Sequence, residues 1–77
     1  MTLQEIKNIS KSVAVNDVER LYDVKEMLIG KTKFGTIVGH YADNRYFFYS
    51  QGKEIFRNSD KSKTINFLKN SYTFKIS

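Results

Sequence analysis

Hydrophobic residues recur every three or four positions from the start of the chain, as on one face of a helix. Thr2 precedes this stripe with Glu5 three residues further on, which is the arrangement of a capping box. These features predict a first helix over residues 2–12. Its apolar stripe consists of Leu3, Ile6, Ile9 and Val13.

A second stripe at helical spacing follows. Asn16 and Glu19 repeat the capping arrangement, and Gly30 stands where a helix C-terminal cap belongs. The pattern therefore predicts a second helix over residues 17–29, with an acidic face in solvent. Its inward stripe would consist of Val18, Leu21, Tyr22, Leu28 and Ile29.

From residue 34 the pattern changes to that of β-strands. Runs rich in β-branched and aromatic residues extend over 36–41, 45–50 and 53–57, with turn residues between them. They predict a three-stranded antiparallel meander. A two-residue turn at 51–52 would give the pairs Tyr49 with Glu54, Phe48 with Ile55 and Phe47 with Phe56.

Both faces of this predicted sheet are substantially apolar. Phe47 and Phe48 are adjacent, so their side chains point to opposite faces, and at least one aromatic group faces away from the helices. The turn near 42–44 has no fixed length in the sequence, and a change of one residue there would reverse the faces of Val38 and His40.

The remaining residues predict a third helix and a short last strand. Residues 58–60 are typical of a helix start, and Ile65, Leu68 and Tyr72 follow at helical spacing. Residues 72–76 alternate polar and apolar, as in a strand. The predicted fold is therefore α+β, in the order α-α-β-β-β-α-β.

Length and composition place these elements in one small domain. A chain of 77 residues, 40% of them hydrophobic, has room for one core, and residues 1–77 are treated as a single domain. It has no cysteine, so neither disulfides nor cysteine-bound zinc can reinforce it. A partner or a second copy of the chain could complete a core this small, so a homodimer is one open alternative.

Charge and aromatic residues divide the chain into two parts. Residues 1–30 carry four bases and five acids, whereas residues 31–77 carry nine bases, three acids and ten of the eleven aromatic residues. Residue types encoded by AT-rich codons (Phe, Tyr, Met, Ile, Asn and Lys) make up 36 of the 77 positions. This bias suggests an AT-rich bacterium, or a phage or mobile element within one, and it explains part of the lysine content without any function.

Sequence signals for catalysis are weak. His40 is the single histidine, so a site with several histidine ligands is excluded. As a general base His40 would need an orienting acid, which only the fold could supply from Asp17, Asp23, Asp43, Glu54 or Asp60. Gly30-Lys31-Thr32 ends like a phosphate-binding loop, but Lys25 stands where that loop requires glycine. Gly35 and Gly39 fit strand entry or a close backbone approach and make no dinucleotide fingerprint. We expect that the protein is not an enzyme and that it binds no metal and no cofactor.

The basic, aromatic second part carries the functional hypothesis. Exposed rings beside cations can stack bases while the cations meet phosphates, as in sheet-based nucleic-acid binders. The same residues could instead be an ordinary core with a solvated basic surface. Nine candidate binding residues follow, six on the sheet and three on the last helix: Tyr41, Arg45, Tyr46, Tyr49, Lys53, Arg57, Lys61, Lys63 and Lys69.

A small basic nucleic-acid-binding module is thus the first hypothesis. The alternative is a protein-binding inhibitor of a host enzyme, such as a defence nuclease, because exposed tyrosines and arginines also anchor protein interfaces. No apolar run approaches the 18 residues of a membrane span, and the first twelve residues do not form the continuous apolar stretch of a signal peptide. We therefore expect a cytoplasmic protein that does not enter membranes.

Overall fold

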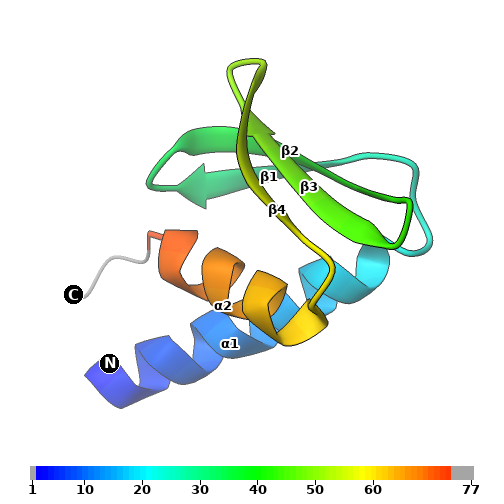
Figure 1. Cartoon of the computed structure of the whole chain (residues 1–77). Helices are drawn as coiled ribbons and strands as arrows, with labels where there is room; N and C mark the ends of the chain where they lie inside the picture. Colours follow the sequence, from blue (N-terminus) through cyan, green and yellow to red (C-terminus); the bar gives the residue numbers. More distant parts are fainter. Residues whose placement is uncertain (1, 74–77) are drawn as a thin grey trace.

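Two helices cover one face of a four-stranded antiparallel sheet in the computed structural model, which describes residues 2–73 (Figure 1). The strands lie side by side in chain order, each joined to the next by a hairpin. The α+β class is confirmed. The elements are α1 (Leu3–Arg20), β1 (Met27–Thr32), β2 (Gly35–Ala42), β3 (Arg45–Ser50), β4 (Lys53–Asn58) and α2 (Lys61–Ser71).

The N-terminal half departs from the prediction, because one helix and one strand replace the two helices. α1 begins with the predicted capping box, in which the Thr2 hydroxyl accepts from the Glu5 N–H at 3.2 Å. It then continues through Asn16, because the stripe of buried residues runs on without a break. Its buried residues are Ile6, Ser10, Ala14 and Val18.

The predicted helix over 17–29 is wrong, because residues 17–20 form the end of α1 and residues 27–29 form the start of the edge strand β1. Met27 and Ile29 are buried and Leu28 between them is exposed, which is the two-residue period of a strand. Gly30 accordingly lies within β1 and is no helix cap. The element order is α-β-β-β-β-α.

Turns with positive φ fix the register of the meander. Asp43 and Asn44 (φ 52° and 62°) and Gln51 and Gly52 (φ 52° and 77°) form two-residue turns in which both central residues have positive φ. This is the conformation that matches the twist of a hairpin. The first of these turns pairs Ala42 with Arg45.

The hairpin formed by β3 and β4 contains a β-bulge. The predicted pair of Tyr49 with Glu54 is confirmed, but Phe48 pairs with Phe56 and Phe47 with Arg57, one residue later than predicted. The extra residue is Ile55, and both Ile55 and Phe56 pack against the core. Burial of two successive apolar residues therefore accounts for the shifted register.

The end of the described chain returns to β1. α2 begins as predicted, with the Asp60 carboxylate accepting from the Lys63 N–H at 3.0 Å. After it, Tyr72 forms an isolated antiparallel bridge with Thr32. Of the strand predicted over 72–76, positions 74–76 lie outside the described residues.

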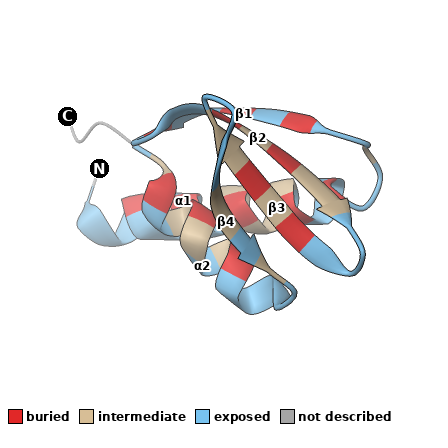
Figure 2. Cartoon of the chain, turned by 45° about the horizontal axis from the view of Figure 1, so that its top comes forward, coloured by how far each residue is buried: buried red, intermediate tan, exposed pale blue. Residues whose placement is uncertain are grey.

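The core lies between the helices and the inner face of the sheet, where the buried residues of the strands gather (Figure 2). Phe48 and Ile37 from the sheet meet Val18 of α1 and Leu68 of α2, and all four side chains are fully buried. Neither helix in residues 2–73 is long and apolar enough to cross a bilayer.

Gly39 is required by the packing of this core. A Cβ added at Gly39 would lie 2.6 Å from Cε1 of the buried Phe48 ring, closer than side-chain carbons approach. We expect Gly39→Ala to lower the free energy of unfolding by about 1–3 kcal/mol, because the ring must shift within a filled core. Urea titration measures the loss.

Gly30→Ala is the matched control on the neighbouring strand. No atom lies within 4 Å of an added Cβ at Gly30, so this change should alter the free energy of unfolding by about 0.5 kcal/mol or less. Equal stability of the two variants would contradict the packing described for Gly39.

Candidate functional site

One face of the sheet carries no helix. Both helices lie on the other side of the sheet (Figure 1), and side chains alternate between the two faces along each strand. Cross-strand pairing then shows which residues share the uncovered face. We call it the open face, and it consists of Leu28, Val38, His40, Arg45, Phe47, Tyr49, Glu54 and Arg57.

Three rings at the centre of the open face are parallel. His40 on β2 lies opposite Phe47 on β3, with ring centroids 4.8 Å apart and planes 8° apart. Tyr49, two residues along β3, lies 5.5 Å from His40 with planes 7° apart. All three side chains are half-buried. The sheet therefore presents a stack of rings whose outer members, Phe47 and Tyr49, can be extended by further flat groups.

Two arginines flank the rings. Arg57 lies opposite Phe47 and Arg45 precedes it by two residues on β3. The Arg57 Nε lies 3.8 Å from the Glu54 Oε1, and both side chains are well exposed, at 53% and 39%. An exposed pair of this kind is weak, so an anion can compete for the guanidinium. The open face thus combines ring faces with cations.

Leu28 and Val38 extend the face towards β1. The two residues are paired across β1 and β2, and Val38 is paired in turn with Tyr49. Leu28 is 70% exposed, a large value for an apolar side chain. The apolar surface is therefore continuous from the edge strand to the ring stack.

No family model matches this sequence, and no curated protein or solved structure matches the chain. Function is accordingly inferred from the chemistry of the open face.

Two of the candidate tyrosines belong to the opposite face. Tyr46 is only 1% exposed and its hydroxyl donates to the Tyr22 hydroxyl, so no base can stack on it there. Burial, and then the bond to Tyr22, raise the pKa of the Tyr46 phenol well above its usual value. Tyr41 is paired with Tyr46 and its ring contacts those of Tyr22 and Tyr46. The sequence analysis predicted both tyrosines as binding residues. Because side chains alternate between the two faces along a strand, both lie on the helix side and not on the open face.

The four candidate lysines do not join the open face. Lys53 pairs with Ser50 beside the turn at the start of β4, and the other three lie on α2, behind the sheet. The Lys61 Nζ lies 3.3 Å from the Glu19 Oε1 and 5.9 Å from the centroid of the Tyr22 ring. Lys63 is exposed and Lys69 is half-buried. Of the nine candidates the structure brings together Arg45, Tyr49 and Arg57.

The apolar and ring residues that the open face adds to these three were not predicted from the sequence as a binding surface. Phe47 could have been found, because it stands two residues from Tyr49 and so shares its face. His40, Val38 and Leu28 required the register of the first two hairpins, which the residues alone left open. Within residues 2–73 no three acidic or histidine side chains gather as metal ligands.

Proposed function

We propose that the chain binds single-stranded nucleic acid on the open face. The observation that carries this proposal is the parallel stack of His40, Phe47 and Tyr49 on a sheet face that no helix covers. Bases of a single strand are free to stack on Phe47 and Tyr49, whereas bases within a duplex are already stacked on each other.

The flanking arginines supply the electrostatic part of binding. Arg45 and Arg57 lie on adjacent strands beside Phe47, so a backbone that follows stacked bases passes within reach of both guanidinium groups. The net charge of +5 supports association at longer range. Phosphate contacts and ring contacts should therefore respond differently to salt.

Replacing both arginines separates these two contributions. We expect Arg45→Gln combined with Arg57→Gln to reduce the slope of log affinity against log salt concentration by about 1.4, since each phosphate contact on a single strand contributes about 0.7. Fluorescence anisotropy with a labelled twelve-residue oligothymidine over a salt series measures it.

The control removes two cations elsewhere. Lys7 and Lys11 are exposed on α1, so Lys7→Gln combined with Lys11→Gln lowers the net charge equally without touching the open face. This variant should lose less of the salt slope than the arginine variant. Equal slopes would show that only net charge matters, and absence of binding by the unmodified chain at low salt would refute the proposal.

A protein partner is the second candidate. Leu28 favours it, because this side chain is 70% exposed beside Val38 and apolar surface of this kind typically marks the core of a protein interface. In this case the chain would act as an inhibitor of a host enzyme. A pull-down from nuclease-treated lysate distinguishes the candidates, because a partner retained after nuclease treatment is a protein.

A further inference from the structure

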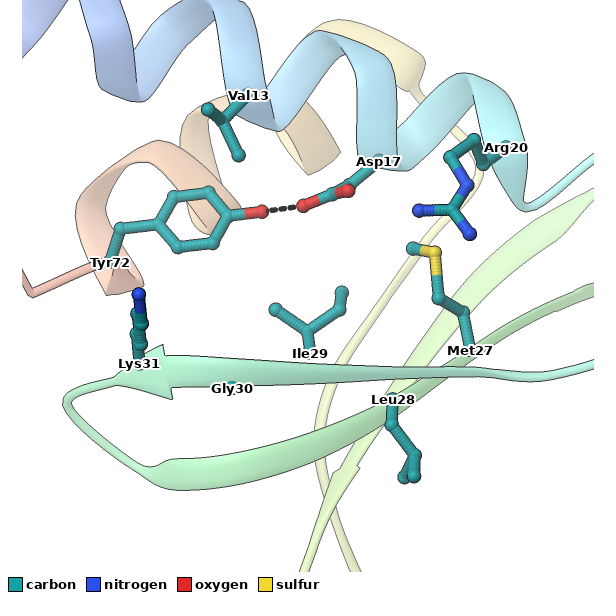
Figure 3. Close-up of a pocket in the computed structure, with 9 residues that line it drawn as sticks. All are labelled: Val13, Asp17, Arg20, Met27, Leu28, Ile29, Gly30, Lys31 and Tyr72. Carbon is teal, nitrogen blue, oxygen red and sulfur yellow. Dashed lines mark hydrogen bonds between the residues drawn. The ribbon is translucent and has the colours of Figure 1, made fainter.

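A cavity of about 310 Å³ lies between α1 and the edge strand β1, on the side of the sheet opposite the open face (Figure 3). Residues 27–31 of β1 form one wall, and Val13, Asp17 and Arg20 of α1 form the other. Met27 and Ile29 point towards α1, whereas Leu28 points away from it. We call this space the β1 groove. It has an apolar floor and one wall made of strand backbone.

Within residues 2–73, the edge of β1 that faces away from β2 is hydrogen-bonded only at one end. β1 is the first strand of the sheet and pairs with β2 along one side only. On its other side, within residues 2–73, the Thr73 N–H donates to the Lys31 carbonyl at 2.8 Å and the Lys33 N–H donates to the Ser71 carbonyl at 2.7 Å. These bonds cover one end of β1, and the remainder of its edge borders the groove. Edge backbone of this kind pairs readily with an extended chain.

The charged side chains of the groove indicate which kind of extended peptide would fit it. The Asp17 carboxylate accepts a hydrogen bond from the Tyr72 phenol, which closes one end of the groove. Arg20 lines the other end, beside Met27, and Lys31 lies on the strand wall. Within residues 2–73 neither Arg20 nor Lys31 forms an ion pair. Among the described residues, both cations of the groove therefore lack an acidic partner.

We propose that the β1 groove binds an extended acidic peptide, which adds to the sheet as an antiparallel strand beside β1. Backbone hydrogen bonds to β1 hold the peptide, and alternate side chains reach Met27 and Ile29 on the groove floor. On the same face of the peptide, acidic side chains at its two ends meet Arg20 and Lys31. The side chains that hold the peptide here, Arg20, Met27, Ile29 and Lys31, are not part of the open face.

Two other occupants give different results. Residues 74–77 follow Thr73 along the chain, but they include Lys75 and no acidic side chain, so their side chains do not complement Arg20 and Lys31. A second copy could instead pair its own β1 with this edge. Both alternatives are distinguished below.

Titration of the full chain with two capped peptides tests the proposal. In one peptide of seven residues the first and seventh are glutamate, the third and fifth are valine and the others are serine, so that glutamate and valine share one face of a strand. The other peptide has lysine in place of glutamate, and binding of both is followed by the backbone amide signals of the protein in NMR spectra. We expect the glutamate peptide to shift the amide signals of residues 27–31 and to bind at least about tenfold more tightly than the lysine peptide. Equal binding, or shifts elsewhere only, would overturn the proposal.

Charge reversal at Arg20 provides the matched comparison. Arg20→Glu should weaken binding of the glutamate peptide about tenfold or more, and Arg20→Lys should restore most of the affinity. Lys11→Glu makes the same change of net charge on α1, about 200° around the helix from Val13, and should change the affinity less than about twofold. Equal losses in Arg20→Glu and Lys11→Glu would reduce the effect to net charge and overturn the proposal.

The remaining outcomes identify the other occupants. Shifts of residues 27–31 that follow protein concentration without any peptide would assign the edge to a second copy. Peptide binding that occurs only after deletion of residues 74–77 would assign the groove to the chain's own end. Either result overturns binding of an acidic partner.

Discussion

Replacing Phe47 and Tyr49 together by leucine should weaken binding of a single-stranded oligonucleotide by about 2–6 kcal/mol, or at least about thirtyfold, with the salt slope unchanged. Each ring stacks one base in the proposed complex, and a stacked base is worth about 1–3 kcal/mol. Leucine keeps an apolar side chain on the open face but offers no flat surface. Fluorescence anisotropy at fixed salt measures the loss.

A single conservative change serves as its control. Tyr49→Phe keeps the ring and removes only the hydroxyl, so its affinity should stay within about threefold of the unmodified chain. Both positions are half-buried on a face without helices, so circular dichroism should show the fold retained in every variant. Should the double leucine variant bind as tightly as the unmodified chain, the ring stack is not where bases bind.

The second large effect is expected in the core, where Leu21→Ala should lower the free energy of unfolding by about 2–5 kcal/mol. Leu21 follows the last residue of α1, is 1% exposed and belongs to the buried cluster with Ile37 and Phe48. Removing its side chain leaves a cavity that this small core cannot close.

Leu28→Ala is the informative comparison, since the sequence pattern placed both leucines on the same buried stripe. Leu28 lies on the open face, so its replacement should cost about 0.5 kcal/mol or less. Urea titration of both variants measures the difference. A large loss of unfolding free energy in Leu28→Ala would mean that Leu28 is buried, as the predicted helix over 17–29 requires.

That stripe shows why the N-terminal half could not be predicted from its residues. Val18 and Leu21 are buried as expected, but Leu28 and Ile29 are adjacent apolar residues that fit a helix or a strand equally well. The choice depends on β2, because Met27, Leu28 and Ile29 pair with residues 37–39 across a hairpin. Contacts of this kind are absent from a local pattern and override it.

Elsewhere the local signals were sufficient. Thr2 and Asp60 cap the two helices at the predicted positions, and the turn at Gln51 and Gly52 gives the predicted pair of Tyr49 with Glu54. Capping and tight turns depend on a few neighbouring residues, so sequence specifies them directly. The bulge at Ile55 was not predictable, because it results from burial against the helices.

The candidate site depended on a single turn. With Asp43 and Asn44 as the two central residues, Ala42 pairs with Arg45 and His40 with Phe47. A turn longer by one residue would have reversed the faces, and Tyr46 in place of Phe47 would then have shared a face with His40. Asparagine and aspartate tolerate positive φ, which favours the observed turn, but the residues 42–44 also fit the longer one.

The arrangement of the elements also determines the order in which the protein can form during its synthesis. Every strand pairs with its neighbour in the chain, so the meander requires only short loops to close and needs no residue beyond 58. α1 is made first, but it packs against α2, which follows the sheet in the chain. Leu68 of α2 is part of the buried core. The apolar stripe of α1 can therefore be buried only after α2 has been made. We expect docking of the two helices to be the step that completes folding.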